Sequence, residues 1–211
     1  FEVVSRESSY AKHIGENQLD IYDEYFNAEN ALLYVDEASK QAAYNTIFEI
    51  ARNGGYYNEI NECGSVIGYN IWYGKGKDCS PKIVKNEFII GYKNEMNELF
   101  KIYEIALHND NSIKGFRDFY NISVREGEKI EITGKSKEDY LFGIKSIDRF
   151  KMKYPRNPDF KQEIDYNFLD YNELRIIMTE GIRFCQDAEC FNTRIDKKQY
   201  EWNIVDRDDY V

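Results

Sequence analysis

Apolar residues recur at helical spacing through the first quarter of the chain. Between His13 and Arg52 there is no proline, and apolar residues recur mainly three, four or seven positions apart. This spacing predicts one long helix with an apolar face. The face consists of Ile14, Ile21, Tyr25, Ala28, Leu32, Val35, Ala42 and Phe48, and is widened by Leu33, Tyr34 and Tyr44. Because Gln18, Ser39 and Thr46 interrupt it, we do not expect a coiled coil; the second half should pack on the domain and the first half should project.

Glycine and proline mark the boundaries of the helices. Asn53-Gly54-Gly55 predicts the end of the first helix, since glycine adopts the left-handed conformation of a C-terminal cap. Ser80-Pro81 predicts the start of a second helix, which helical spacing extends to His108 with a break at Gly91. Its apolar side consists of Val84, Phe88, Met96, Leu99, Tyr103 and Ala106.

The second half of the chain changes to strand-like alternation. Residues 119–125 and 129–135 predict a hairpin around Glu126-Gly127-Glu128, and residues 140–147 predict a third strand of the same meander. Residues 154–158, YPRNP, predict a loop. A further strand is expected at 164–168.

A third helix is expected to begin at Asp170, with Glu173 in capping-box spacing, and to end near Cys185. Its apolar side consists of Leu174, Ile177, Met178, Ile182 and Phe184. A last strand is expected at 199–205. Helices followed by a small antiparallel sheet define an α+β class. We expect one domain in total, with a helical arm at 1–55 and a body at 56–211.

Composition indicates a folded, acidic protein. Of 211 residues, 42% are hydrophobic, and 18 Tyr and 13 Phe argue against disorder. The 28 basic and 38 acidic residues give a net charge of -10 without a basic run, so nucleic acid is not an expected partner. The chain has no apolar stretch of membrane-spanning length, yet it begins FEVVSRESS without Met. We interpret this start as the remnant of a signal peptide or membrane anchor. A cleaved fragment of a cytosolic protein is the alternative.

Four cysteines fall into two local pairs. Although four cysteines allow three connectivities, pairing Cys63 with Cys79 and Cys185 with Cys190 is the economical arrangement. The first bond would stabilise the fold by roughly 3 kcal/mol in the chain-entropy model. Because disulfides persist in oxidising compartments, the pairs predict an extracytoplasmic protein.

Zinc and a cysteine nucleophile are the alternative uses of these cysteines. Structural zinc requires Cys or His ligands in closely spaced pairs, which this chain lacks. Cys63-Gly64-Ser65 resembles the motif of papain-like proteases, but Val66 and Ile67 stand where the nucleophile and its aromatic neighbour belong. A role for Cys63 would need His108 as its partner. We therefore expect no catalytic residue, no metal and no cofactor.

Asn121-Ile122-Ser123 matches the N-glycosylation acceptor pattern, so Asn121 is a candidate glycosylation site if the chain is exported.

The segment from Ala28 to Gly55, followed by ECG, GYNIW and a second cysteine before Pro81, resembles uncharacterised membrane-anchored extracytoplasmic proteins of small-genome archaea. The resemblance implies an N-terminal membrane segment, a long helix and a disulfide-bearing outer domain. It implies no activity and transfers no functional residue.

The leading hypothesis is a non-enzymatic, membrane-tethered extracytoplasmic domain that contacts another protein or the cell envelope. One alternative is a pilin-like filament subunit, because such subunits also combine a long N-terminal helix with a sheet and a short disulfide loop. The other is a cell-envelope hydrolase that uses Cys63 or a carboxylate pair such as Asp36 and Glu37. Adjacent carboxylates on a helix point about 100° apart, which makes that pair a poor one. The ligand and the oligomeric state stay open.

Overall fold

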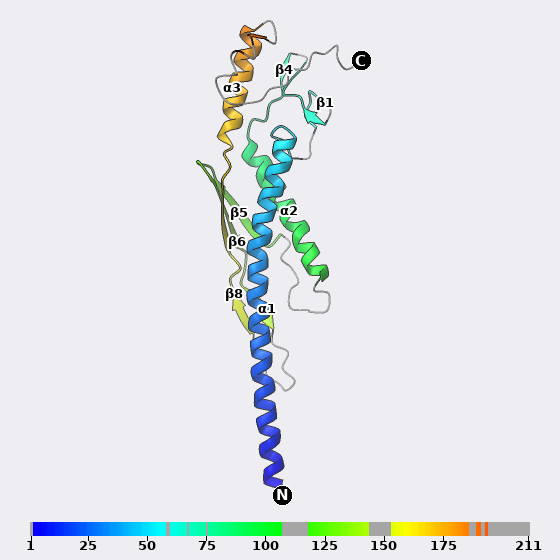
Figure 1. The fold of residues 1–211 in the computed structure, drawn as a ribbon, viewed down its shortest axis with the longest axis vertical. Coiled ribbons are helices and arrows are strands. Elements are labelled where there is room, and N and C mark those ends of the chain that lie inside the picture. Colours follow the sequence, from blue (N-terminus) through cyan, green and yellow to red (C-terminus); the bar gives the residue numbers. More distant parts are fainter. Residues whose placement is uncertain are drawn as a thin grey trace.

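The described part of the chain has the predicted α+β architecture. The computed structural model describes residues 2–57, 60–66, 68–74, 76–106, 118–143, 153–185, 189–190 and 193. Within these residues, two helices pack beside a small antiparallel sheet, a third helix lies beyond one end of it, and further short strands form two-stranded ribbons (Figure 1).

The first helix, α1 (Glu2–Arg52), has 51 residues and a length of about 75 Å at the usual rise per residue. It begins before the predicted start at His13. Its N-terminal half extends beyond the rest of the molecule, as expected (Figure 1). It ends at the predicted glycines, where Gly55 N donates a 2.7 Å hydrogen bond to Ile50 O and both Gly54 and Gly55 have positive φ.

The buried face of α1 differs from the predicted one. It is made mainly of small side chains: Ala28, Ala31, Val35, Ala38, Ser39, Ala42, Ala43, Thr46 and Ile50. Ser39 and Thr46, which we expected to interrupt the face, belong to it. They fit because each hydroxyl donates a 2.7 Å hydrogen bond to a carbonyl of its own helix, Asp36 O and Ala42 O respectively. Phe48, which we expected on this face, is 64% exposed.

The second helix, α2 (Val84–Ala106), packs along α1. It begins after the predicted start at Ser80-Pro81, and it continues through Gly91 without the predicted break. A Cβ atom at Gly91 would lie 2.5 Å from the Tyr57 ring and 2.7 Å from the Thr46 methyl group. Gly91 is therefore a point of close packing between the helices rather than a helix end. The buried side of α2 consists of Val84, Phe88, Tyr92, Met96 and Phe100.

The main sheet has the strand order β5-β6-β9, all antiparallel. Its strands are β5 (Tyr120–Arg125), β6 (Ile130–Ser136) and β9 (Phe160–Ile164). The predicted hairpin is confirmed as β5 and β6. The predicted strand at 164–168 is wrong, since the strand ends at Ile164. Gly134 lies opposite Phe160 of β9: a Cβ atom there would lie 2.2 Å from the Phe160 ring, so glycine makes room for that ring.

The predicted extension of the meander is also wrong. β7 (Tyr140–Gly143) pairs with β8 (Lys153–Arg156) in a separate two-stranded sheet, so residues 154–156 are strand rather than loop. Pro155 is tolerated there because a two-stranded sheet has only edge strands. Arg156 Nη2 also contacts Glu29 Oε1 on α1 at 3.0 Å.

The core lies between the inner face of α1, α2 and one face of the main sheet. Buried Val124, Ile132 and Ile164 line the sheet side, with the Phe100, Tyr120 and Phe160 rings packed together. Burial raises the pKa of both Tyr92 and Tyr120.

The third helix, α3 (Leu169–Phe184), ends beside Cys185 as predicted. The predicted capping box at Asp170 is wrong: the N-cap is Phe168, and the Asp170 carboxylate instead accepts a 2.9 Å hydrogen bond from Asn167 Nδ2. On its apolar side Met178 is buried, whereas Phe184 is 58% exposed. The predicted strand at 199–205 and His108 lie outside the described residues.

Four two-residue strands occupy the segment between α1 and α2. They are β1 (Ser65–Val66), β2 (Tyr69–Asn70), β3 (Tyr73–Gly74) and β4 (Lys77–Asp78). β1 pairs with β2 and β3 with β4.

Candidate functional site

Two features of the molecule are candidates for function: the disulfide-closed loop at 63–79 and the exposed side of α1. In the loop, Cys63 is bonded to Cys79, and Cys185 is bonded to Cys190 beyond α3. These are the predicted local pairs. The loop contains the two small hairpins β1-β2 and β3-β4.

Asn61, two residues before Cys63, is hydrogen-bonded to three points of the loop. Its side-chain amide donates to Ile71 O at 2.7 Å and to Cys79 O at 3.1 Å, and its Oδ1 accepts from Cys63 N at 3.1 Å. The polar groups of one asparagine thus hold both cysteine-bearing segments.

The loop is fixed to the C-terminal end of α1 by its own side chains. Trp72 Nε1 donates a 2.6 Å hydrogen bond to Gly54 O, and Asn70 Nδ2 donates a 2.9 Å bond to Asn53 O. Tyr56 in turn donates from its hydroxyl to Cys79 O at 2.7 Å. The Trp72 ring is half-buried and lies 6.3 Å from the Tyr171 ring of α3. The loop therefore joins the end of α1 to the chain leading into α2, with the Trp72 side chain bonded to the end of α1.

Asp78 orders the segment that leads into α2. Its carboxylate accepts from Ser80 N at 2.9 Å and from Ser80 Oγ at 2.5 Å. These hydrogen bonds favour the charged form and lower the pKa of Asp78.

The two disulfides leave none of the four cysteines available as a thiolate. All four sulfurs are in disulfides, so Cys63 carries no thiol that could attack a substrate or bind zinc. Lys77 Nζ, on β4, lies 3.6 Å from Glu62 Oε2. Among the described residues, no three His, Cys, Asp or Glu side chains gather as a metal ion would require.

Asn121 lies on β5, at an edge of the main sheet. Its side chain and that of Ser123 are exposed, whereas Tyr120 and Val124 point into the core. The Asn121 amide and the Ser123 hydroxyl of the glycosylation pattern therefore lie on the solvent side of an edge strand.

The exposed side of α1 carries large apolar side chains. We define the outer face of α1 as Leu19, Tyr22, Phe26, Leu33, Tyr44 and Phe48, whose exposed fractions lie between 49% and 64%. Sequence reasoning missed this face because it merged Leu33, Tyr44 and Phe48 with the buried one. The available signal was the separate series at 19, 22, 26 and 33, with spacings of three, four and seven residues.

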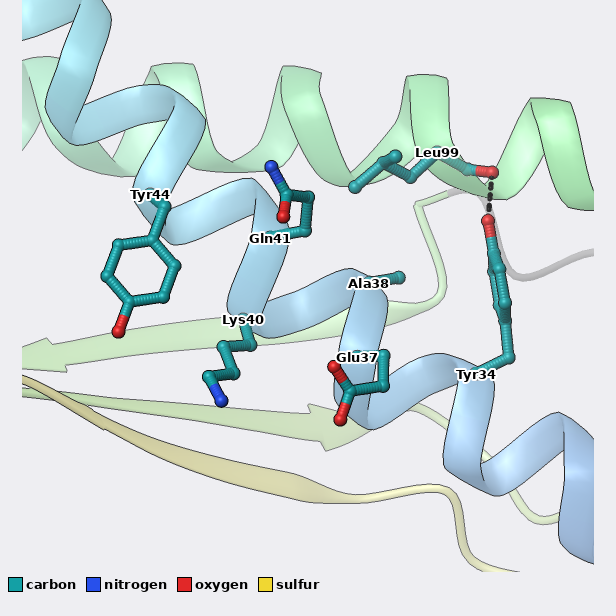
Figure 2. A pocket seen from close by; sticks show the side chains of 7 residues that line it. All are labelled: Tyr34, Glu37, Ala38, Lys40, Gln41, Tyr44 and Leu99. Atoms are coloured by element: carbon teal, nitrogen blue, oxygen red, sulfur yellow. Dashed lines mark hydrogen bonds between the residues drawn. The ribbon is translucent and has the colours of Figure 1, made fainter.

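A hollow of about 430 Å³ opens on the same side of α1 (Figure 2). It is lined by Tyr34, Glu37, Ala38, Lys40, Gln41 and Tyr44 of α1 and by Leu99 of α2. Figure 2 shows the Tyr34 hydroxyl reaching α2, where it donates a 2.6 Å hydrogen bond to Leu99 O. Partial burial raises the pKa of Tyr34, and partial desolvation of an otherwise exposed carboxyl, together with the Glu37 carboxylate, raises that of Asp36.

Asp36 and Glu37 themselves are both exposed, and they are adjacent residues of a helix. The lining of the hollow thus combines the tyrosine rings, Ala38 and Leu99 with one acidic and one basic side chain, Glu37 and Lys40.

Comparison of the chain with protein-family models, curated proteins and solved structures gave no match. Within the described residues, no helix combines the length and the apolar content that a membrane crossing needs.

Proposed function

We propose that the chain is a non-enzymatic extracytoplasmic domain, tethered to a membrane, that functions by contact with another protein or with a component of the cell envelope. The observation that carries this proposal is the use of all four cysteines in two local disulfides. Such bonds persist in oxidising compartments and are rare in the cytosol.

Two further features support a contact role. The disulfide loop directs the side chains of Asn61, Asn70 and Trp72 to its own backbone and to the end of α1, so these groups serve the fold. The outer face of α1 leaves six large apolar side chains exposed, and contiguous apolar surface of this kind marks interaction sites. The tether itself rests on the resemblance drawn from the sequence.

Thiol titration tests the compartment. Protein isolated from its native cells, with thiols blocked at lysis, should show no reactive thiol under denaturation until a reductant is added. A Cys185→Ser/Cys190→Ser variant should then release half as many thiols on reduction, as a matched control. Four thiols in the unreduced protein would contradict the extracytoplasmic proposal.

The tether is tested with the full gene product. It should sediment with membranes and resist alkaline extraction, whereas a chain starting at Phe1 should be released. Recovery of the full product in the supernatant would contradict the tether.

Asn121 is the proposed glycan acceptor of the exported chain. Expression in a host that glycosylates exported proteins should add mass that Asn121→Gln removes and that Asn157→Gln, at an exposed position outside the acceptor pattern, leaves. An unmodified wild-type chain would contradict this assignment.

A further inference from the structure

The outer face of α1 lies on the opposite side of the helix from the core. Because successive residues of a helix turn by about 100°, Leu19, Tyr22, Phe26 and Leu33 share one stripe, and Tyr44 and Phe48 continue it. The buried residues from Ala28 to Ile50 lie on the other side. No described element covers the outer face, and part of it lies on the projecting half of α1 (Figure 1).

The size of this face suits a protein interface. Four half-exposed aromatic side chains and two leucines present on the order of 600 Å² of apolar surface per copy. Stable interfaces bury roughly 800 Å² per partner, and the polar residues beside the stripe would supply the remainder.

The spacing of the stripe is nearly symmetric about Leu33. Phe26, Tyr22 and Leu19 lie seven, eleven and fourteen positions before Leu33. Lys40, Tyr44 and Phe48 lie seven, eleven and fifteen positions after it. A two-fold axis through Leu33 and across α1 would therefore pair Leu19 with Phe48, Tyr22 with Tyr44, and Leu33 with itself. Such a self-complementary patch is what a two-fold dimer requires.

The same axis places Phe26 of the second copy opposite Lys40, at the hollow. The hollow has about 430 Å³, whereas a cavity of about 150 Å³ already accommodates benzene. A phenylalanine ring can enter it with the Lys40 ammonium group beside its face, a favourable cation–π arrangement.

Charge selects the antiparallel orientation. Residues 16–29 carry five acidic side chains and no basic one, namely Glu16, Asp20, Asp23, Glu24 and Glu29. Residues 37–50, which the axis places opposite, carry Glu37, Lys40 and Glu49, a net charge of -1. Parallel pairing would set the acidic segment against itself, whereas antiparallel pairing sets it against this less acidic segment that contains Lys40. The acidic flank also disfavours an anionic lipid surface as the occupant.

We propose that the outer face of α1 binds the same face of a second copy of this chain, with the two helices antiparallel and crossing at Leu33. The proposal specifies the partner in the proposed function, and it rests on that function for the location of the chain at a membrane. Because the axis crosses α1, the two N-termini point in opposite directions, so tethered copies meet from two facing membranes.

Sedimentation equilibrium of the whole chain over a concentration series tests the dimer. The wild type should form dimers, and Leu33→Glu should weaken them roughly a hundredfold or more, because it places two like charges at the axis. Ile102→Glu is the matched control: Ile102 and Leu33 are both 60% exposed, but Ile102 lies on α2. A wild type that stays monomeric, or a dimer that Leu33→Glu leaves unchanged while its circular dichroism melt matches the wild type, overturns the proposal.

Cross-linking tests the orientation. With Leu19→Cys and Phe48→Cys variants mixed, a short bismaleimide should join position 19 of one copy to position 48 of the other. Efficient joining of 19 to 19 would indicate parallel helices and overturn it.

Vesicle clustering tests the setting separately. Chains attached through an N-terminal His tag to nickel-lipid vesicles should cluster them, and the Leu33→Glu variant should not. Dimers in solution without clustering would overturn the facing-membrane setting, while failure of the thiol test above would overturn the compartment.

Discussion

The two sides of α1 differ in the size of their apolar side chains, and the larger ones are outside. The inner face is built from alanine, serine and threonine with Val35 and Ile50, and it is fully or almost fully buried. The outer face has leucine, tyrosine and phenylalanine, about half exposed. Small residues let α2 and the sheet approach α1 closely, and close packing rather than side-chain size sets the stability of that face.

In the proposed dimer, one helix carries two interfaces. Large apolar side chains in water gain little from the monomer fold, and the proposed partner would cover their stripe. Substitutions on the two faces should therefore affect different quantities. Changes on the inner face should alter the free energy of unfolding of the monomer, and changes on the outer face should alter the dimer dissociation constant.

Ala42→Leu on the inner face should have the largest effect on stability. Ala42 is fully buried, so a larger side chain forces the helices apart and should lower the free energy of unfolding by about 3 kcal/mol. Tyr44→Leu, two residues away on the outer face, should change it by less than about 0.5 kcal/mol. Chemical denaturation at low protein concentration measures both free energies of unfolding. Equal losses would show that the two faces contribute alike to the stability of the monomer.

Gly91→Ala tests the same packing from α2. Alanine would ordinarily stabilise a helix interior by about 1 kcal/mol relative to glycine. Here its Cβ atom would meet Tyr57 at 2.5 Å, so we expect a net loss of about 1–2 kcal/mol. Lys93→Ala, at an exposed position of α2, is the control. A stabilised Gly91→Ala protein would show that the helices are not in close contact at this point.

Trp72→Phe tests the hydrogen bond that attaches the disulfide loop to the C-terminal end of α1. It removes the donor of the hydrogen bond to Gly54 O, which should cost about 1 kcal/mol in thermal or chemical unfolding. Tyr69→Phe, on an exposed side chain of the same loop, should cost less. If both variants unfold like the wild type, the loop does not stabilise the end of α1.

Asp78→Asn should have the smallest effect and a distinct pH dependence. Because hydrogen bonds from Ser80 lower the pKa of Asp78 in the folded protein, its contribution is complete above the usual aspartate pKa of about 4 and is lost as the pH falls through the lowered value. The stability difference between wild type and variant should therefore be constant near neutral pH and shrink in acid. A difference that grows in acid would contradict the assigned contacts.

Local signals predicted part of this structure. The end of α1 at Gly54-Gly55, the β5-β6 hairpin and the two disulfide pairs each depend on residues close in sequence, and the structure contains all three.

Features that depend on distant packing were not predictable in this way. The pairing of β9 with β6 joins residues far apart in sequence and sets the Phe160 ring over Gly134. Whether Ser39 faces the core is decided by a hydroxyl that bonds its own helix. The candidate interface was visible as a second stripe, but separating it from the first required knowing which side α2 covers.

The most direct test of the account is the distance between spin labels in the dimer. All four native cysteines are in disulfides, so single cysteines at Gln18 or Asn30, both exposed on α1, can be labelled separately. For antiparallel helices crossing at Leu33, labels at position 30 lie about 9 Å apart along the axis and labels at position 18 about 45 Å apart. A short distance at 30 with a long one at 18 is the predicted result. Short distances at both positions, or no intermolecular signal at either, would contradict the account.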